Sequence, residues 1–126
     1  MSKKNWYGDF KNEARLPKVE ILRGYRSFDR VFQKGISIQK SHTILFFLQA
    51  NEKKIGFVVS KKVRKAVLRN RLKRKLREIY RLNKNIFPDN YHYILLARGT
   101  SYNFQELKNE ILQAVAELTR LNNVNE

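Results

Sequence analysis

The stretch VRKAVLRNRLKRKLREIYR at residues 63–81 decides the fold, because its pattern requires a long helix that packs against other elements. At about 100° per residue, its apolar side chains fall on one side of a helix and its polar and basic side chains on the other. The apolar side comprises Leu68, Leu72, Leu76, Ile79 and Tyr80, and Leu82, the residue just after the stretch, continues it. The opposite side comprises Asn70, Lys73, Arg74, Arg77 and Arg81. The stretch is predicted to be an amphipathic helix that covers a sheet with its leucines.

The basic side of this helix carries more like charge than a solvated surface needs. Nine of the nineteen residues are Lys or Arg, and only Glu78 opposes them. Ordinary solvated helices pair opposite charges three or four residues apart, whereas Lys73–Arg77 and Arg77–Arg81 are like-charge pairs, each costing roughly 0.2–0.5 kcal/mol. Phosphate groups would neutralise that repulsion, and the fork of an Arg side chain matches phosphate geometry. The pattern therefore predicts nucleic-acid binding.

The composition of the whole chain also indicates a polyanionic partner. The 126 residues, 42% of them hydrophobic, suffice for one domain with a core. The net charge of +16 exceeds the magnitude of roughly 2–8 that solubility asks of a small domain. Residues 60–81 hold eleven basic residues and one acidic residue, whereas residues 99–126 hold two and four. The absence of cysteine excludes disulfides and thiolate metal sites.

No segment has the apolar length of a secretory signal or a membrane span. The longest apolar run is ILFFL at residues 44–48, and the first residues are polar and include acids. We therefore expect a cytoplasmic protein with no membrane partner. A helix lying on a membrane surface is the competing interpretation of residues 63–81, but the predicted sheet needs the leucine side as its cover.

Two further helices are predicted, one before and one after the basic helix. SFDRVFQKG at residues 27–35 repeats apolar residues at helical spacing and ends in Gly35. NFQELKNEILQAVAELTRL at residues 103–121 is amphipathic, and Asn103 with Glu106 forms the pattern of a capping box.

The strands are predicted from β-branched and aromatic runs. ISIQKSHTILFFLQA at residues 36–50 predicts one long strand or two with a break near Lys40, and IGFVVS and YHYILLA predict short buried strands. The order α-β-β-β-α-β-α predicts an α+β fold, a single two-layer sandwich. The predicted organisation is a flexible basic arm, a single α+β domain and a C-terminal tail, at residues 1–18, 19–121 and 122–126.

The sequence lacks the arrangements typical of an autonomous nuclease. His42 and His92 are isolated, and Asp9, Asp29 and Asp89 are dispersed without metal-ligand spacing. No glycine-rich phosphate loop occurs. A binding role is therefore predicted, with no catalytic protein residue and no metal ligand.

The string SKKVRKAVLRNRLKRKLREIYR at residues 60–81 resembles the signature of the bacterial ribonuclease P protein subunit. Its core resembles that family's Arg-Asn-Arg motif at Arg69, Asn70, Arg71, Lys73, Arg74, Arg77 and Glu78. The likeness continues in LRGYRSFDRVFQKG, IGFVVSKK and YHYILLARGTSYNFQEL, and it covers residues 22–121.

The resemblance implies a fold and a function. The family is an α+β sandwich in which the basic helix makes an unusual left-handed crossover. Its protein binds a large catalytic RNA and the 5′ leader of precursor tRNA, and the holoenzyme is an endoribonuclease that removes the leader. The chemistry belongs to the RNA and to Mg²⁺ bound mainly by it. We expect one protein per RNA.

The resemblance also implies site residues by position. The residues implied to bind the catalytic RNA are Lys61, Lys62, Arg69, Asn70, Arg71, Lys73, Arg74 and Arg77. The residues implied to bind the leader, in a cleft, are Phe28, Phe32 and Phe46. From spacing alone, Phe28 and Phe32 are more typical of a core. Because strand side chains alternate, only one of Phe46 and Phe47 can face the leader.

Arg64 departs from the resembled family, which usually has Gly at this position. If the backbone there has positive φ, an Arg strains the turn or the turn differs. The predicted N-terminal arm is longer than that of the family, and the sequence assigns it no role beyond general electrostatics.

Two other functions are weighed against this resemblance. A structural RNA-binding protein of ribosomal type would use the same helix and could bury the three phenylalanines. A DNA-binding helix of homeodomain type is disfavoured, because the predicted strands do not fit a three-helix fold.

Overall fold

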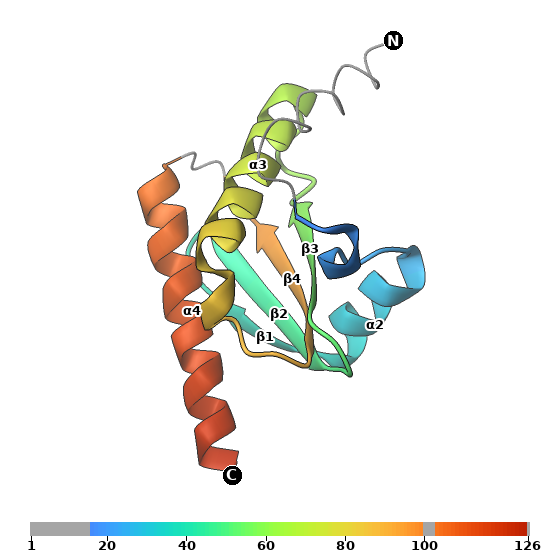
Figure 1. Cartoon of the computed structure of the whole chain (residues 1–126). Coiled ribbons are helices and arrows are strands. Elements are labelled where there is room, and N and C mark those ends of the chain that lie inside the picture. Colours follow the sequence, from blue (N-terminus) through green and yellow to red (C-terminus); the bar gives the residue numbers. More distant parts are fainter. Residues whose placement is uncertain (1–15, 100–102, 126) are drawn as a thin grey trace.

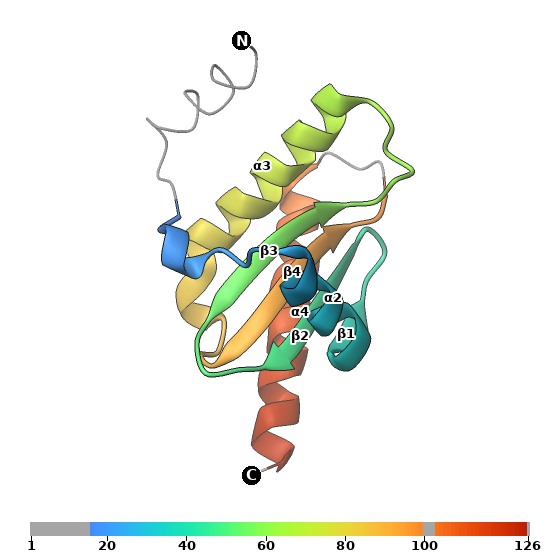
Figure 2. The same ribbon diagram turned by 90° about the vertical axis from the view of Figure 1, so that its right-hand side faces the viewer.

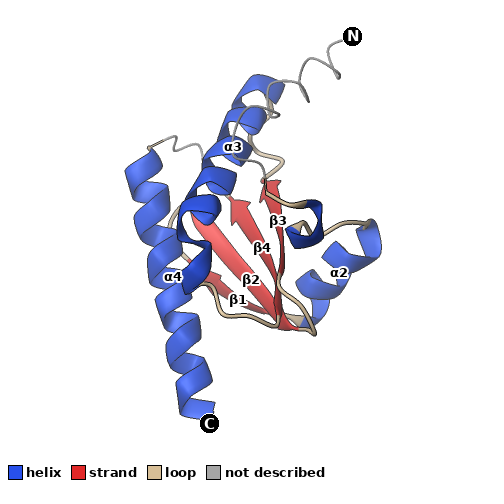
Figure 3. Cartoon of the chain, in the orientation of Figure 1, coloured by secondary structure: helices blue, strands red, loops and turns tan. Residues whose placement is uncertain are grey.

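The computed structural model describes residues 16–99 and 103–125, whose elements follow the predicted order α-β-β-β-α-β-α (Figure 3). Two short 3₁₀ helices are added, one before the first α-helix and one after the basic helix. The elements are η1 (Lys18–Glu20), α2 (Tyr25–Lys34), β1 (Ile36–Gln39), β2 (Thr43–Gln49), β3 (Lys54–Val59), α3 (Ala66–Asn83), η2 (Lys84–Ile86), β4 (Tyr91–Ala97) and α4 (Phe104–Asn125). The stretch at residues 36–50 is thus two strands, with the break at the predicted place.

The four strands form one mixed sheet in the order β1-β2-β4-β3. Strand β2 pairs antiparallel with β1 and β4, whereas β3 and β4, which α3 connects, are parallel. In Figure 1, α3 lies in front of the sheet, both strands point upward, and the chain passes from β3 on the right to β4 on the left. This is the left-handed sense, which occurs in only about 2% of such connections. The predicted fold class is confirmed, including this uncommon feature.

Helices α3 and α4 cover one face of the sheet, and α2 covers part of the other (Figures 1 and 2). The main core lies under the two long helices and includes Leu45, Ile55, Leu72, Leu76, Ile79, Tyr80, Tyr93, Leu95, Leu107 and Ile111. A smaller cluster under α2 contains Leu22, Val31 and Ile94. The long helices form the second layer of the predicted sandwich, and α2 adds a partial layer on the opposite face.

The predicted apolar side of residues 63–81 packs as expected, with one exception next to the end of the helix. Leu72, Leu76, Ile79 and Tyr80 are buried, and Leu68 packs against the core. Leu82 is 57% exposed, because α3 ends at the next residue and no longer lies along the core. Within the described ranges, no helix combines the length and the apolar character needed to cross a bilayer.

Two helix ends lie where the sequence predicts them. Helix α2 ends at Gly35, whose N–H donates to the carbonyl oxygen of Val31 at 2.9 Å. At the start of α4, Asn103 Oδ1 accepts a hydrogen bond of 3.0 Å from the N–H of Glu106, which satisfies one of the free donors of the first turn.

The folded region extends beyond residues 19–121 at both ends. Leu16 is buried in the main core, so the last residues of the predicted arm belong to the domain. Helix α4 runs to Asn125, so most of the predicted tail is helical. The sequence suggests coil at both places, because of Pro17 and of the polar residues after Leu121. Residues 1–15 of the predicted arm lie outside the described residues.

Glu110 on α4 ties this helix to the start of β2. Its Oε1 accepts hydrogen bonds from the N–H of His42 and the hydroxyl of Thr43, each at 2.9 Å. Its Oε2 lies 2.7 Å from Nδ1 of His42. Burial would raise the pKa of Glu110, but these hydrogen bonds outweigh burial and lower the pKa from its ordinary value. The prediction that His42 is isolated is wrong, because α4 supplies its partner from a distant part of the sequence.

Replacing Glu110 by Gln should lower the stability of the protein at pH 5 by about 1–2 kcal/mol, because the replaced carboxylate accepts three hydrogen bonds. A carboxyl group with a lowered pKa stabilises the fold above its ordinary pKa of 4.5 and loses this effect as the pH falls through the lowered value. The stability difference between the wild type and Glu110→Gln should therefore shrink from pH 5 to pH 3. Urea denaturation at both values measures it, and an equal difference at both would contradict the role of the charge.

Candidate nucleic-acid interface

The loop between β3 and α3 carries exposed cations and is held in shape by Arg69. The exposed cations are Lys61, Lys62, Arg64 and Lys65. The guanidinium of Arg69 donates to the carbonyl oxygens of Val59 at 3.1 Å, Ser60 at 2.9 Å and Val63 at 3.0 Å. Arg69 therefore points into the loop. The geometry favours a structural role for Arg69, in contrast to the direct RNA contact that its motif position implies.

The basic side of α3 faces away from the main core. Arg71 and Arg74 are exposed, while Asn70, Lys73 and Arg77 are half-buried on the same helix. Together with Lys61 and Lys62 they form what we call the α3 basic surface. The two groups are adjacent in space because the loop leads directly into the first turn of α3.

The two ends of this surface differ in their charge environment. The Arg77 guanidinium lies 5.5 Å from the centroid of the Phe57 ring, in a cation–π arrangement on the β3 side of the helix. Arg81, which the sequence places on the same side, donates to both carboxylate oxygens of Glu78, at 3.0 and 2.6 Å. The carboxylate thus neutralises the C-terminal end of the basic side.

Burial, and after it the crowding of like charges, lowers the pKa values of two lysines on α3. The pKa of Lys73 is lowered by burial first and then by the charges of Arg69 and Arg77. The pKa of Lys75 is lowered by burial and by Arg71. Nearby phosphates would relieve this repulsion and favour the charged lysines. The electrostatics of α3 therefore suit a polyanion.

Arg64 fits the backbone without strain. Among the described residues, Asn90 alone combines a side chain with a positive φ, of 68°. Arg64 is consequently outside the left-handed region, and the turn does not require Gly. Its side chain adds one exposed charge to the loop.

The three phenylalanines implied to bind the leader lie together on the face of the sheet that carries α2. The Phe32 and Phe46 rings meet edge to face, with centroids 4.9 Å apart. Phe28 packs over Gly56, where an added Cβ would lie 2.4 Å from Cζ of Phe28. Phe32 is 38% exposed, and Phe28 and Phe46 are half-buried. We call these three residues the aromatic patch.

The alternation of β2 decides which neighbouring phenylalanine belongs to this patch. Phe46 pairs with Ile94 on the α2 side, whereas Phe47 is buried on the opposite side and contacts Tyr91. The next row of the α2 side, formed by Ile44, Leu96 and Val58, is only half-buried. Part of this sheet face is thus accessible beside the aromatic patch.

The aromatic patch and the α3 basic surface lie on two sides of β3. Figure 2 shows β3 in front, with α3 on one side of it and α2 on the other. Val58 belongs to the accessible row, and Lys61 follows three residues later in the loop to α3. The accessible row beside the aromatic patch and the first cations of the α3 basic surface therefore both lie at the C-terminal end of β3.

His92 lies in β4 on the α2 side. Its Nε2 is buried without a hydrogen bond and lies 3.8 Å from the Glu52 carboxylate. Burial lowers the pKa of His92, as do the charges of Lys54 and Arg30, and the Glu52 carboxylate acts against them. His92 is a strand residue, as predicted, with Glu52 as its nearest acidic partner.

The chain is similar to proteins of one family. A model of the family described as "Ribonuclease P" matches residues 16–119. The ribonuclease P protein component of Pelotomaculum thermopropionicum is 37% identical over 108 residues, which are 81% of this chain and 96% of that protein. That of Natranaerobius thermophilus is 42% identical over 85 residues, covering 66% and 74%.

A solved structure has the same architecture. The RNase P protein from Thermotoga maritima superposes with a TM-score of 0.69 at 30% identity, over 76% of this chain and 94% of that one. The alignment therefore includes most of the sheet and helices described above.

Proposed function

This chain belongs to the ribonuclease P protein family, and we infer that it holds two RNAs at once, the catalytic RNA and the 5′ leader of precursor tRNA. Family membership makes it the protein subunit of a ribonucleoprotein endoribonuclease that acts in tRNA processing. The catalytic RNA would lie along the α3 basic surface, and the leader would lie on the aromatic patch. We propose one protein per RNA and a cytoplasmic holoenzyme.

The observation that carries this proposal is the placement of two different surfaces on either side of β3. One surface is cationic and suits the phosphates of a structured RNA. The other combines accessible aromatic rings with a half-buried sheet row, which suits the unstacked bases of a single strand. A ribosomal-type binder would need only the first surface, and the comparisons do not favour that alternative.

The cleavage chemistry is proposed to belong to the RNA and to Mg²⁺ held mainly by it. The described residues contain no group of three or more His, Asp or Glu side chains that could hold a metal ion. The protein residues would instead orient the substrate and offset phosphate repulsion, so that the RNA reaches its active form with less Mg²⁺.

The catalytic RNA would contact Lys61, Lys62, Asn70, Arg71, Lys73, Arg74 and Arg77, while Arg69 would act through the shape of the loop. The direct test mixes the purified protein with the catalytic RNA at low Mg²⁺ and measures cleavage of precursor tRNA. Stimulation by the protein is expected. Cleavage that the protein leaves unchanged would overturn the proposal.

Replacing Phe32 by Ala should weaken binding of precursor tRNA to the holoenzyme by about 1–3 kcal/mol, the value of one stacked base. Binding of mature tRNA should not change, because it lacks the leader. Phe32→Tyr is the matched control, since it keeps the ring and should keep the affinity. If Phe32→Ala instead mainly lowers the melting temperature, Phe32 serves the core and not the leader.

A further inference from the structure

Tyr25, the first residue of α2, has an aromatic side chain that does not pack against the rest of the described structure. It is 82% exposed. No hydrogen bond, ion pair or ring contact joins it to another residue of the described ranges. An aromatic residue also has a lower helix propensity than Ala, so the helix gains nothing from a Tyr at this place. Neither packing nor helix stability explains the ring.

Tyr25 continues the line of the aromatic patch. Tyr25, Phe28 and Phe32 are three and four residues apart, so at about 100° per residue they lie within roughly 60° of one another around α2. Tyr25 and Phe32 are separated by about 10 Å along the helix axis, at 1.5 Å per residue. This distance corresponds to about three base-stacking rises of 3.4 Å. The two rings can therefore serve different nucleotides of one strand.

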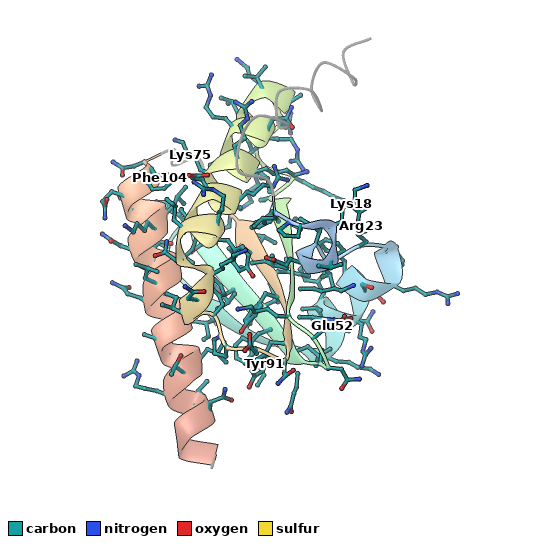
Figure 4. The ribbon with its side chains drawn as sticks, viewed as in Figure 1. Lys18, Arg23, Glu52, Lys75, Tyr91 and Phe104 are labelled. Atoms are coloured by element: carbon teal, nitrogen blue, oxygen red, sulfur yellow. The ribbon has the colours of Figure 1, made fainter. Side chains whose placement is uncertain are left out.

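The surroundings of Tyr25 are cationic. Arg23 and Arg26 flank it in sequence and are exposed, and no ion pair holds either of them within the described part of the chain. Figure 4 labels Arg23 on the η1–α2 side of the molecule, together with Lys18. The only acid of α2, Asp29, accepts hydrogen bonds from the Gln33 amide at 3.0 and 3.1 Å.

An exposed ring between unpaired guanidinium groups is the arrangement that binds single-stranded nucleic acid, with the ring stacking on a base and the cations near the backbone. We propose that Tyr25, with Arg23 and Arg26, is a further stacking site for the single-stranded leader. It would hold a nucleotide other than those at Phe28, Phe32 and Phe46. This inference rests on the proposed function, since the strand is the leader.

The test measures the affinity of the reconstituted holoenzyme for precursor tRNAs whose leaders are shortened one nucleotide at a time, and for mature tRNA. Tyr25→Ala should weaken binding of the longest leader by roughly five- to hundredfold, as expected for one stacked base. Tyr25→Phe keeps the ring and should bind like the wild type. Leu121→Ala, which truncates an exposed apolar residue on α4, should also bind like the wild type.

Leader length separates Tyr25 from the aromatic patch. The loss of affinity caused by Tyr25→Ala and that caused by Phe32→Ala should disappear at different leader lengths, because the two rings are about 10 Å apart.

The double variant with Arg23→Gln and Arg26→Gln tests the two cations beside Tyr25. It should reduce the salt dependence of leader binding by about 0.7 per lost phosphate contact.

Three results would overturn the inference. These are unchanged affinity of Tyr25→Ala, an equal loss with mature tRNA, and penalties that disappear at the same leader length as those of Phe32→Ala. A wild-type holoenzyme that does not distinguish precursor from mature tRNA would instead refute the proposed leader contact itself. The two failures are therefore distinguishable.

Discussion

Replacing Arg69 by Ala should destabilise the free protein by about 2–4 kcal/mol, although the motif position of Arg69 implies an RNA contact. Its guanidinium donates to the carbonyl oxygens of Val59, Ser60 and Val63. Hydrogen bonds to charged groups contribute about 1.5–3 kcal/mol each, and water can reach the half-buried site and restore part of the loss. Affinity for the catalytic RNA should also fall, because Lys61 and Lys62 lie on that loop. Thermal unfolding without RNA measures the first effect directly.

Arg74→Ala is the matched control for this prediction. Arg74 is an exposed residue of the same helix, and removing it should change stability by no more than about 0.5 kcal/mol. It should instead flatten the salt dependence of RNA binding by about 0.7–0.9, one phosphate contact. Arg69→Ala could instead leave the melting temperature unchanged and flatten the salt dependence of RNA binding as Arg74→Ala does. That result would show that Arg69 contacts phosphate and would contradict its structural role.

Gly35→Ala should destabilise the fold by about 3 kcal/mol, the upper range for a side chain forced into packed structure. The new Cβ would lie 2.5 Å from the carbonyl oxygen of Val31 and 2.7 Å from that of Phe47. Both obstacles are backbone atoms, so the end of α2 must move relative to β2. Because Phe32 and Phe46 lie on these elements, leader binding should weaken as well. Urea denaturation and a leader-binding assay measure the two effects.

Gly24→Ala distinguishes this clash from a general intolerance of α2 to substitution. Gly24 has a φ of 87°, and a Cβ there would meet nothing within 4 Å. Its cost should be limited to backbone strain of about 1–3 kcal/mol, because a φ of 87° with a ψ of 145° lies near a region that essentially only Gly adopts. A Gly35→Ala protein that is as stable as Gly24→Ala would show that the junction of α2 and β2 can adjust.

Much of the fold was predictable because the relevant patterns are local. The leucine spacing of α3 placed Leu72, Leu76 and Ile79 in the core, and Asn103 marked the start of α4. Leu82 was predicted on the apolar side but is exposed, because helical periodicity does not indicate where a helix ends and leaves the core. In the same way, the polar residues after Leu121 give no signal that α4 continues to Asn125.

The candidate site was predictable in composition and less so in geometry. Residue order separated the basic side of α3 from its leucine side, and the resemblance drew attention to Phe28, Phe32 and Phe46. Spacing alone favoured a core for two of these rings, because helical periodicity cannot distinguish a buried side from one that lines an accessible sheet face. Tyr25 was missed although it lies three residues before Phe28, since a single exposed aromatic is common on protein surfaces.

The sequence by itself determined the α+β order of elements, the polyanionic partner and the two sides of α3, because charge and periodicity are properties of neighbouring residues. The tertiary structure alone decided that Arg69 turns into the β3–α3 loop, that Phe46 and not Phe47 joins the α2 side, and that His42 meets Glu110. Each of these depends on which atoms of distant segments meet. The two proposed RNA surfaces likewise lie on either side of β3 because of the order of the strands in the sheet. The number of residues between them in the sequence does not set the distance between them in space.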